Sequence, residues 1–310
     1  MLLFSRRLWP VAALCIRHVA GAYNNTVCNQ RSYTISSDDL TFNPNAWNPD
    51  SEGFQCLSVQ DSPPAFKATW AWSSDSGEVH SYPHVKLTAP ALPVSLSNIS
   101  ALLLSAKWSM GPGSTPRPAL SVDSLGLAER STTANVAFDL FADRNAANAQ
   151  NETMADTEIM IWVGNYGNAQ PLGFELERSC FNTTHSLPRA ERKGTNVFTW
   201  MATANRTGFS AEISPLLQYL WRNGLVSVDS HLGIVSFGSE AFHSEGNVTF
   251  SASEFDLHLV TGAAPKLVVG QLPLSCISSE SRGVSIRPQG LWLSRVPIIA
   301  LVGAVLFLTW

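Results

Sequence analysis

The chain has 310 residues, of which 14% are charged and 45% hydrophobic, and its formal net charge is −4. This balance lacks the basic field that proteins use to bind nucleic acid, so a nucleic-acid partner is excluded from the expected functions. One all-β sandwich can reach this length, so the sequence does not require a second domain.

The N-terminal segment has the order of a secretory signal peptide. Arg6 and Arg7 precede the apolar stretch 8–15, and the small residues 20–22 follow it. This order is typical of a signal that is cleaved after its small residues, and a segment this short does not span a bilayer as an ordinary helix. We therefore predict that residues 1–22 are removed and that the mature chain is extracellular.

The stretch from residue 23 to residue 279 consists of short alternating runs, which indicate one β domain. Clusters of Gly, Pro, Asn and Ser separate these runs, as in a chain whose many strands pack in two sheets. We found no internal repeat and no low-complexity linker, so the predicted domain is residues 23–279.

The first informative strand is predicted over residues 135–141. Side chains alternate between the two faces of a strand, so Asn135, Ala137 and Asp139 point one way. The apolar residues between them point the other way and mark the core face. Asp139 therefore lies on a non-core face.

The second informative strand is predicted over residues 157–163, where Glu158, Met160 and Trp162 share one face. The Ile and Val residues between them form the core face. A carboxyl group beside Met and Trp indicates a partly dry cleft, where desolvation raises a carboxyl pKa. The plainer alternative is a surface carboxylate with no such role.

One helix is predicted after these strands, with Ser214 as its cap, Pro215 in its first turn and Asn223-Gly224 as its stop. A last informative strand is predicted over residues 233–242. Its alternation places Glu240 on the more open face.

The C-terminal segment is an apolar block that runs from Val296 to the final residue and includes Thr309, and no charged tail follows it. Small residues within 278–283 and a polar spacer precede it, which is the order of a glycosylphosphatidylinositol attachment signal. The alternative is a membrane helix from Leu291, but this helix would have to carry Arg295. We favour a lipid anchor at the cell surface and predict that residues 280–310 are spacer and removed signal.

Sequons and cysteines both fit a chain that passes through an oxidising secretory compartment. Six sequons predict glycosylation at Asn24, Asn98, Asn151, Asn182, Asn205 and Asn247. The cysteines that remain after removal of the signal are Cys28, Cys56, Cys180 and Cys276. Four cysteines allow three pairings.

Three segments together resemble glycoside hydrolase family 12, the secreted endoglucanases and xyloglucanases. They are 134–141, 158–173 and 237–242, and weaker matches include Thr69-Trp-Ala-Trp72. The resemblance covers roughly residues 27–260. It implies an all-β jelly-roll sandwich of two antiparallel sheets with a concave substrate cleft, to which the sequence pattern adds one short helix.

The resemblance also implies a retaining mechanism. Glu158 matches the family nucleophile and Glu240 matches the acid/base, and such a pair acts across the scissile bond at about 5 to 5.5 Å. Asp139 matches a carboxylate beside the nucleophile, where it would hold Glu158 and tune the charge that the acids share. The expected activity is endo-acting hydrolysis of a β-1,4-glucan, namely cellulose, mixed-linkage glucan or xyloglucan.

Glucan chains present flat apolar sugar faces, so aromatic platforms are expected in such a cleft. The candidates are Trp162, Trp72 and Trp47, with Met160 shaping the floor. For Trp72 a place in the core is equally well supported, and Trp70 on the same face should share its environment.

The pair Cys28 and Cys56 belongs to the resemblance, because these residues flank the first hairpin. We predict that they form a disulfide, and Cys180 and Cys276 would then form a second one. The sequence departs from the family pattern at residues 38–40, at 187–190 and in the turn 241–245, which leaves the substrate range open.

The main alternative is a cell-surface carbohydrate-binding protein with the same fold and no turnover. Retention of Glu158 and Glu240 argues against it. A copper-dependent oxidative enzyme is not indicated, because cleavage after Ala22 leaves Tyr23 at the N-terminus. The sequence contains no Gly-x-Ser-x-Gly and no metal-binding motif, so no metal site and no cofactor are expected, and the predicted protein is a monomer.

Overall fold

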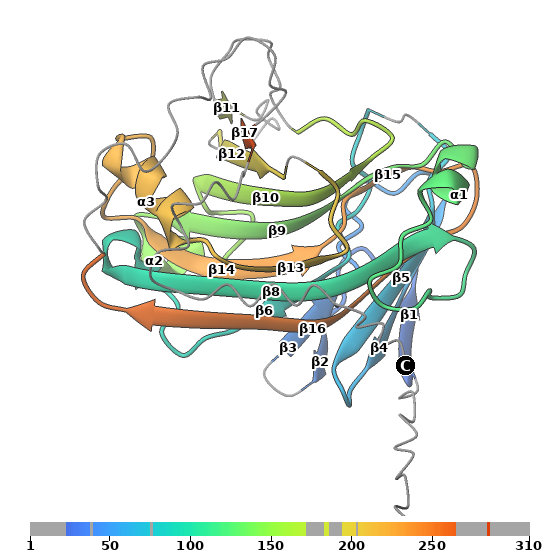
Figure 1. Ribbon diagram of the computed structural model, residues 1–310, viewed down its shortest axis with the longest axis horizontal. Coiled ribbons are helices and arrows are strands. Elements are labelled where there is room, and N and C mark those ends of the chain that lie inside the picture. Colours follow the sequence, from blue (N-terminus) through green and yellow to red (C-terminus); the bar gives the residue numbers. More distant parts are fainter. Residues whose placement is uncertain are drawn as a thin grey trace, which may run out of the picture.

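Two packed β-sheets form the part of the chain that the computed structural model describes (Figure 1). The described residues are 23–37, 40–74, 77–171, 194–202 and 204–264, together with the backbone of short strands at 183–185 and 284–285. The predicted signal peptide, and most of the predicted anchor signal, lie outside them.

The smaller sheet has six strands, all joined by antiparallel pairing. Their spatial order is β1 (Asn25–Cys28), β4 (Phe54–Gln60), β5 (Ala65–Ala71), β16 (Val248–Thr261), β8 (Ile99–Pro112) and β13 (Gly208–Glu212).

The larger sheet carries the acidic residues. Its spatial order is β11 (Thr183–His185), β12 (Asn196–Met201), β10 (Thr157–Tyr166), β9 (Thr133–Asp143), β14 (His231–Gly238), β6 (His84–Leu87), β3 (Leu40–Asn43) and β2 (Ile35–Ser37). Three shorter strands join it, β15 (Ala241–His243) on β9, β7 (Val94–Ser95) on β14 and β17 (Val284–Ser285) on β12. The pairing is antiparallel except that β12 runs parallel to β10 and to β17.

The predicted core faces are confirmed. The apolar core-face residues that the sequence predicts on β9 and β10 all lie in the main hydrophobic cluster between the sheets, namely Val136, Phe138, Leu140, Ile159, Ile161 and Val163. Phe138 and Phe237 of neighbouring strands lie with ring centroids 4.6 Å apart, and Phe237 also contacts Phe250 of the opposite sheet at 6.2 Å. The all-β sandwich therefore follows from the period-two pattern that the sequence shows.

The predicted helix is α3 (Ser214–Arg222), but the prediction for its cap was wrong. The N-cap is Ile213, whose side chain cannot accept a hydrogen bond. Glu212 takes over this task, because its Oε1 accepts the backbone N–H of Ser214 at 2.8 Å and that of Leu102 at 2.9 Å. A carboxylate near a helix N-terminus is electrostatically favourable.

Three further short helical segments join the strands. They are η1 (Leu96–Asn98), α1 (Ser124–Glu129) and α2 (Ala146–Ala149). The side chains of Asp123 and Asn145 cap α1 and α2. Both helices are too short to show an apolar period in the sequence, and in Figure 1 α1 and α3 lie at opposite ends of the sandwich.

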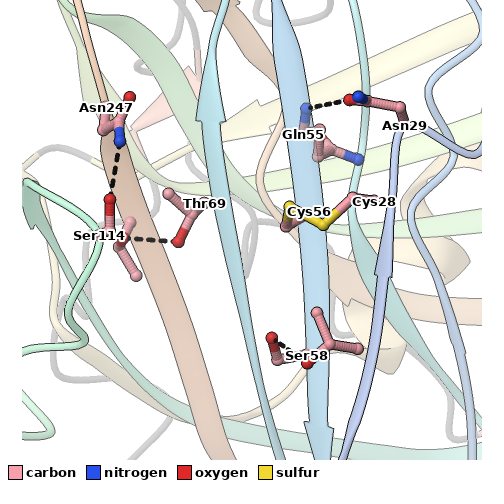
Figure 2. The surroundings of a disulfide bond; sticks show 10 residues. Cys28, Asn29, Gln55, Cys56, Ser58, Thr69, Ser114 and Asn247 are labelled. Atoms are coloured by element: carbon pink, nitrogen blue, oxygen red, sulfur yellow. Dashed lines mark hydrogen bonds between the residues drawn. A yellow bond between two sulfur atoms is a disulfide. The ribbon is translucent and has the colours of Figure 1, made fainter.

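The predicted disulfide between Cys28 and Cys56 is present (Figure 2). The two residues lie directly opposite each other in the antiparallel pair of β1 and β4. Cys180 and Cys276 lie outside the described residues, so the second predicted bridge stays a prediction.

Replacing both Cys28 and Cys56 by Ser is expected to lower the free energy of unfolding by about 3 to 4 kcal/mol, because a bridge across this separation restricts the unfolded chain. The separation is 28 residues. Urea unfolding of the oxidised protein and of the double variant measures the effect. Equal midpoints and slopes for the two proteins would contradict the prediction.

Most of the predicted glycosylation residues lie in the described part of the chain. Asn24, Asn98, Asn151 and Asn205 are exposed and Asn247 is half-buried, whereas Asn182 lies outside the described residues. Among the described residues, no helix has the length and apolar character needed to span a membrane.

Candidate active site

The central strands of the larger sheet bring the predicted acidic residues to one face. Asp139 on β9 lies opposite Met160 on β10 and opposite Ser236 on β14. Glu158 precedes Met160 by two positions on β10, so both side chains point to the same face. The opposite face of these strands is packed in the core.

Glu240 reaches this face through an interruption of the predicted strand 233–242. β14 ends at Gly238 and β15 begins at Ala241, so Glu240 lies between them. The backbone N–H of Glu240 donates to the side-chain Oδ1 of Asn135 at 2.8 Å, and the backbone N–H of Asn135 donates to the carbonyl of Glu240 at 3.1 Å. The Asn135 side chain thus replaces a ladder partner at this position.

Along β9, Asp139 lies between the positions of the two glutamates. Glu158 pairs with Phe141, and Glu240 lies beside Asn135 at the other end of the same row. Asp139 is 5% exposed, whereas Glu158 and Glu240 are half-buried. The three carboxyl groups therefore share one partly dry surface.

Burial, together with the charge of neighbouring carboxylates, raises the pKa of each of these carboxyl groups. Burial, followed by the charge of Glu152, raises the pKa of Glu158 to about 7. Burial, followed by the charge of Glu158, raises the pKa of Glu240 to about 8. Burial, followed by the charges of Glu158 and Glu240, raises the pKa of Asp139 well above its ordinary value.

Charge effects of this kind act over short distances. The charge of Glu158 raises the pKa of Glu240 and of Asp139, so these acids from distant segments of the sequence lie within electrostatic reach of one another. Such a cluster can hold one carboxyl protonated while another is ionised, which general acid and base chemistry requires.

Sequence reasoning missed a second set of groups at this surface. The Tyr82 hydroxyl donates to the carbonyl of Ala137 at 3.1 Å, and His84 Nδ1 lies 2.8 Å from the carbonyl of Tyr82. His84 Nε2 lies 3.8 Å from the carboxylate of Glu152, which comes from the turn between α2 and β10.

No local pattern marks Glu152 as part of the site, because only the fold brings its turn to His84. Gly238, in contrast, is a local sign of the close contact between β14 and the chain at the start of β6. A Cβ atom at position 238 would lie 2.4 Å from the carbonyl oxygen of Pro83, so only glycine fits there.

The predicted sugar platforms occupy different environments. Trp162 and Met160 pack with Ala137 and Phe242 in a second hydrophobic cluster on the face that carries the acids. Their exposed fractions are 2% and 3%. They therefore shape the floor beside Glu158 more than they project from it.

Trp72 lies in the core, so its prediction as a sugar platform was wrong and the alternative prediction of a core residue is confirmed. It packs in the main cluster with Trp70, and its Nε1 donates to the Ser81 hydroxyl at 3.2 Å. Its ring is therefore not open to a sugar. Trp47 is half-exposed, and its backbone carbonyl accepts a hydrogen bond from Arg31.

Among the described residues, no group of three His, Cys, Asp or Glu side chains is arranged to hold a metal ion.

Asp139→Asn is expected to raise the free energy of unfolding at pH 8 and to leave it nearly unchanged at pH 4. A carboxyl whose pKa is raised on folding contributes stability that is complete below its unfolded pKa and is lost as the pH rises toward the folded value. One pKa unit corresponds to about 1.4 kcal/mol, so a gain of at least this size is expected at pH 8.

Urea unfolding at both pH values measures this effect, with Asp256→Asn as a control on the exposed face of β16. If Asp139→Asn changed stability equally at pH 4 and pH 8, the elevated pKa of Asp139 would be wrong.

Comparison with known proteins gives one consistent family. The model of "Glycosyl hydrolase family 12" matches residues 38–259. Endoglucanase A of Aspergillus kawachii is 28% identical over 76% of this chain and 93% of its own length. A probable xyloglucan-specific endo-beta-1,4-glucanase A of Aspergillus clavatus is 25% identical over 75% of this chain and 91% of its own length.

Among solved structures, the native family 12 xyloglucanase from Bacillus licheniformis superposes with a TM-score of 0.61. It is 21% identical, and the match covers 76% of this chain and 100% of that chain. At this identity the likeness concerns the fold, and it confirms the predicted jelly-roll sandwich.

Proposed function

This chain belongs to glycosyl hydrolase family 12 and is a glycoside hydrolase, and on this premise we propose that it is an endo-acting β-1,4-glucan hydrolase with a retaining mechanism. The observation that carries the proposal is the shared surface of Glu158 and Glu240. Each carboxyl has a pKa far above that of an exposed glutamate, and the charge of one raises the pKa of the other.

In the first step, the Glu158 carboxylate attacks the anomeric carbon while Glu240 donates its proton to the glycosidic oxygen. The bond between that carbon and oxygen breaks, and a glycosyl ester on Glu158 forms as the leaving chain departs. In the second step, Glu240 takes a proton from water as the water oxygen attacks the same carbon. The ester bond breaks, and the sugar keeps its original configuration.

The environments support this assignment of roles. Burial raises the pKa of both carboxyl groups, and the charge of Glu158 raises the pKa of Glu240 further. Ionisation of Glu158 therefore favours a protonated Glu240, which is the combination that the first step requires. Asp139 lies opposite Met160, two positions along from Glu158. It would hold the Glu158 carboxyl in place and tune the charge that the acids share.

The substrate assignment rests on the named activities of the relatives and on the floor of the site. Trp162 and Met160, which are nearly buried, would form the floor under the sugar, and we assign the more open sugar contact to Trp47, the one half-exposed residue of the three. Cellulose, mixed-linkage glucan and xyloglucan are the candidate polymers. The same proposal places the mature domain, residues 23–279, outside the cell as a glycosylated monomer that a lipid anchor holds at the cell surface.

Release of reducing sugar from these three polymers by the expressed protein tests the function. We expect hydrolysis of at least one polymer, with products of intermediate length appearing first because the enzyme is endo-acting. Nuclear magnetic resonance of the fresh product should show the β-anomer before mutarotation. Tight polymer binding with no reducing sugar would instead favour a carbohydrate-binding protein.

A further inference from the structure

We infer that Asn135 is a positioning residue for the acid/base Glu240, and that its side-chain amide selects which carboxyl oxygen of Glu240 carries the proton. This inference deepens the proposed function and rests on it. It concerns the protonation of the leaving group, not the binding of the sugar.

The contacts between the two residues involve both the main chain and the side chain of Glu240. Oδ1 of Asn135 accepts the backbone N–H of Glu240 at 2.8 Å, and Nδ2 of Asn135 donates to Oε2 of Glu240. The backbone of Asn135 adds a bond to the carbonyl of Glu240 at 3.1 Å. Asn135 itself is fully buried on β9, so its side chain is held in place.

The orientation of the Asn135 amide follows from chemistry. A backbone N–H only donates, so the atom that faces it must be the amide oxygen. The amide nitrogen therefore faces Oε2 of Glu240 and donates to it.

An oxygen that accepts this bond is disfavoured as the site of the acidic hydrogen. In the protonated acid the hydrogen is therefore placed on Oε1, which is not engaged by Asn135. General acid catalysis requires a proton that points at the leaving oxygen.

A local structural role would not require the second contact. The bond from the backbone N–H of Glu240 to Oδ1 is enough to close the interruption between β14 and β15. The further bond from Nδ2 reaches the functional end of Glu240. The interruption between β14 and β15 is also held by Ser239, whose hydroxyl donates to the carbonyl of Asn135 at 2.5 Å.

The titratable groups around Glu240 come from two strands and from the segment before β6. The charge of Glu158 on β10 raises the pKa of Glu240. The charge of Glu240 in turn raises the pKa of Asp139 on β9 and of Tyr82 before β6. Burial and the charge of Glu158 raise the pKa of Glu240, whereas the hydrogen bond from the Asn135 amide lowers it. Loss of the amide should therefore raise this pKa and move the alkaline limb of the activity profile to higher pH.

The test compares Asn135→Ala and Asn135→Asp with the wild-type protein on two aryl β-cellobiosides. One carries a poor leaving group that needs protonation, and the other carries dinitrophenolate, which leaves without it. For Asn135→Ala we expect kcat/KM to fall by about 10- to 100-fold on the first substrate, a smaller loss than the roughly 10²- to 10⁴-fold that removal of the general acid itself causes. The fall on the second substrate should be much smaller.

Asn135→Asp adds a rescue. An aspartate at this position keeps an acceptor for the backbone N–H of Glu240 but can donate to Oε2 only when protonated. Activity on the poor leaving group should therefore recover as the pH falls. The matched control is Asn165→Ala, because Asn165 lies opposite Asn135 on β10 and its side chain bonds to the carbonyl of Ala169.

Equal losses on both substrates, or an alkaline limb that does not move, would assign Asn135 a merely structural role and overturn the inference. A wild-type protein that cleaves neither aryl glycoside and no polymer would overturn the proposed function, and the inference would fall with it. Changes in the Asn165→Ala control that match those of Asn135→Ala would also overturn it, because they would not be specific to Glu240.

Discussion

Replacing Glu158 by Gln is expected to lower kcat on a β-glucan by about 10⁴-fold or more, the order of loss that removal of a catalytic nucleophile causes. The amide nearly preserves the shape of the carboxylate but cannot attack the anomeric carbon. It also removes a charge that raises the pKa of Glu240 and of Asp139. The fold should therefore persist while turnover is lost.

Reducing-sugar release and thermal unfolding, measured on the same preparation, separate these effects. Glu129→Gln, at the exposed end of α1, makes the same chemical change away from the site and should keep wild-type activity. Turnover by Glu158→Gln within tenfold of the wild type would remove Glu158 from the nucleophile role.

Replacing Glu240 by Ala is expected to lower kcat/KM on a β-glucan by about 10²- to 10⁴-fold, because the leaving oxygen then departs without a proton. The same variant should still form the glycosyl ester from a dinitrophenyl glycoside, whose leaving group needs no acid. Hydrolysis of that ester should be slow, because no base activates the water.

Added azide distinguishes the two glutamates by the configuration of the product. Azide needs no deprotonation, so in Glu240→Ala it attacks the glycosyl ester, releases the Glu158 carboxylate and gives the β-glycosyl azide. In Glu158→Ala it attacks the substrate from the face that the carboxylate vacated and gives the α-glycosyl azide. Products of the opposite configurations would exchange the two assignments.

Much of the fold could be predicted from the sequence because its signal is local. Alternation along β9 and β10 placed Phe138 in the core and Glu158 on the other face, and the structure has both. Local reasoning was less secure where several elements meet. It could not decide between cleft and core for Trp72, because both faces of β-sheets in a sandwich accept aromatic residues.

The sequence by itself determined the strand faces and the apolar core, since each depends on neighbours within a few positions along the chain. The choice of Glu158 and Glu240 as the expected catalytic acids came from the resemblance of whole segments to the family. Only the tertiary structure decided that Asn135 holds Glu240 and that Glu152 reaches His84. It also decided that β12 pairs in parallel with β10. These contacts join residues far apart in sequence. Their geometry depends on how the strands order, register and twist, which no local periodicity encodes.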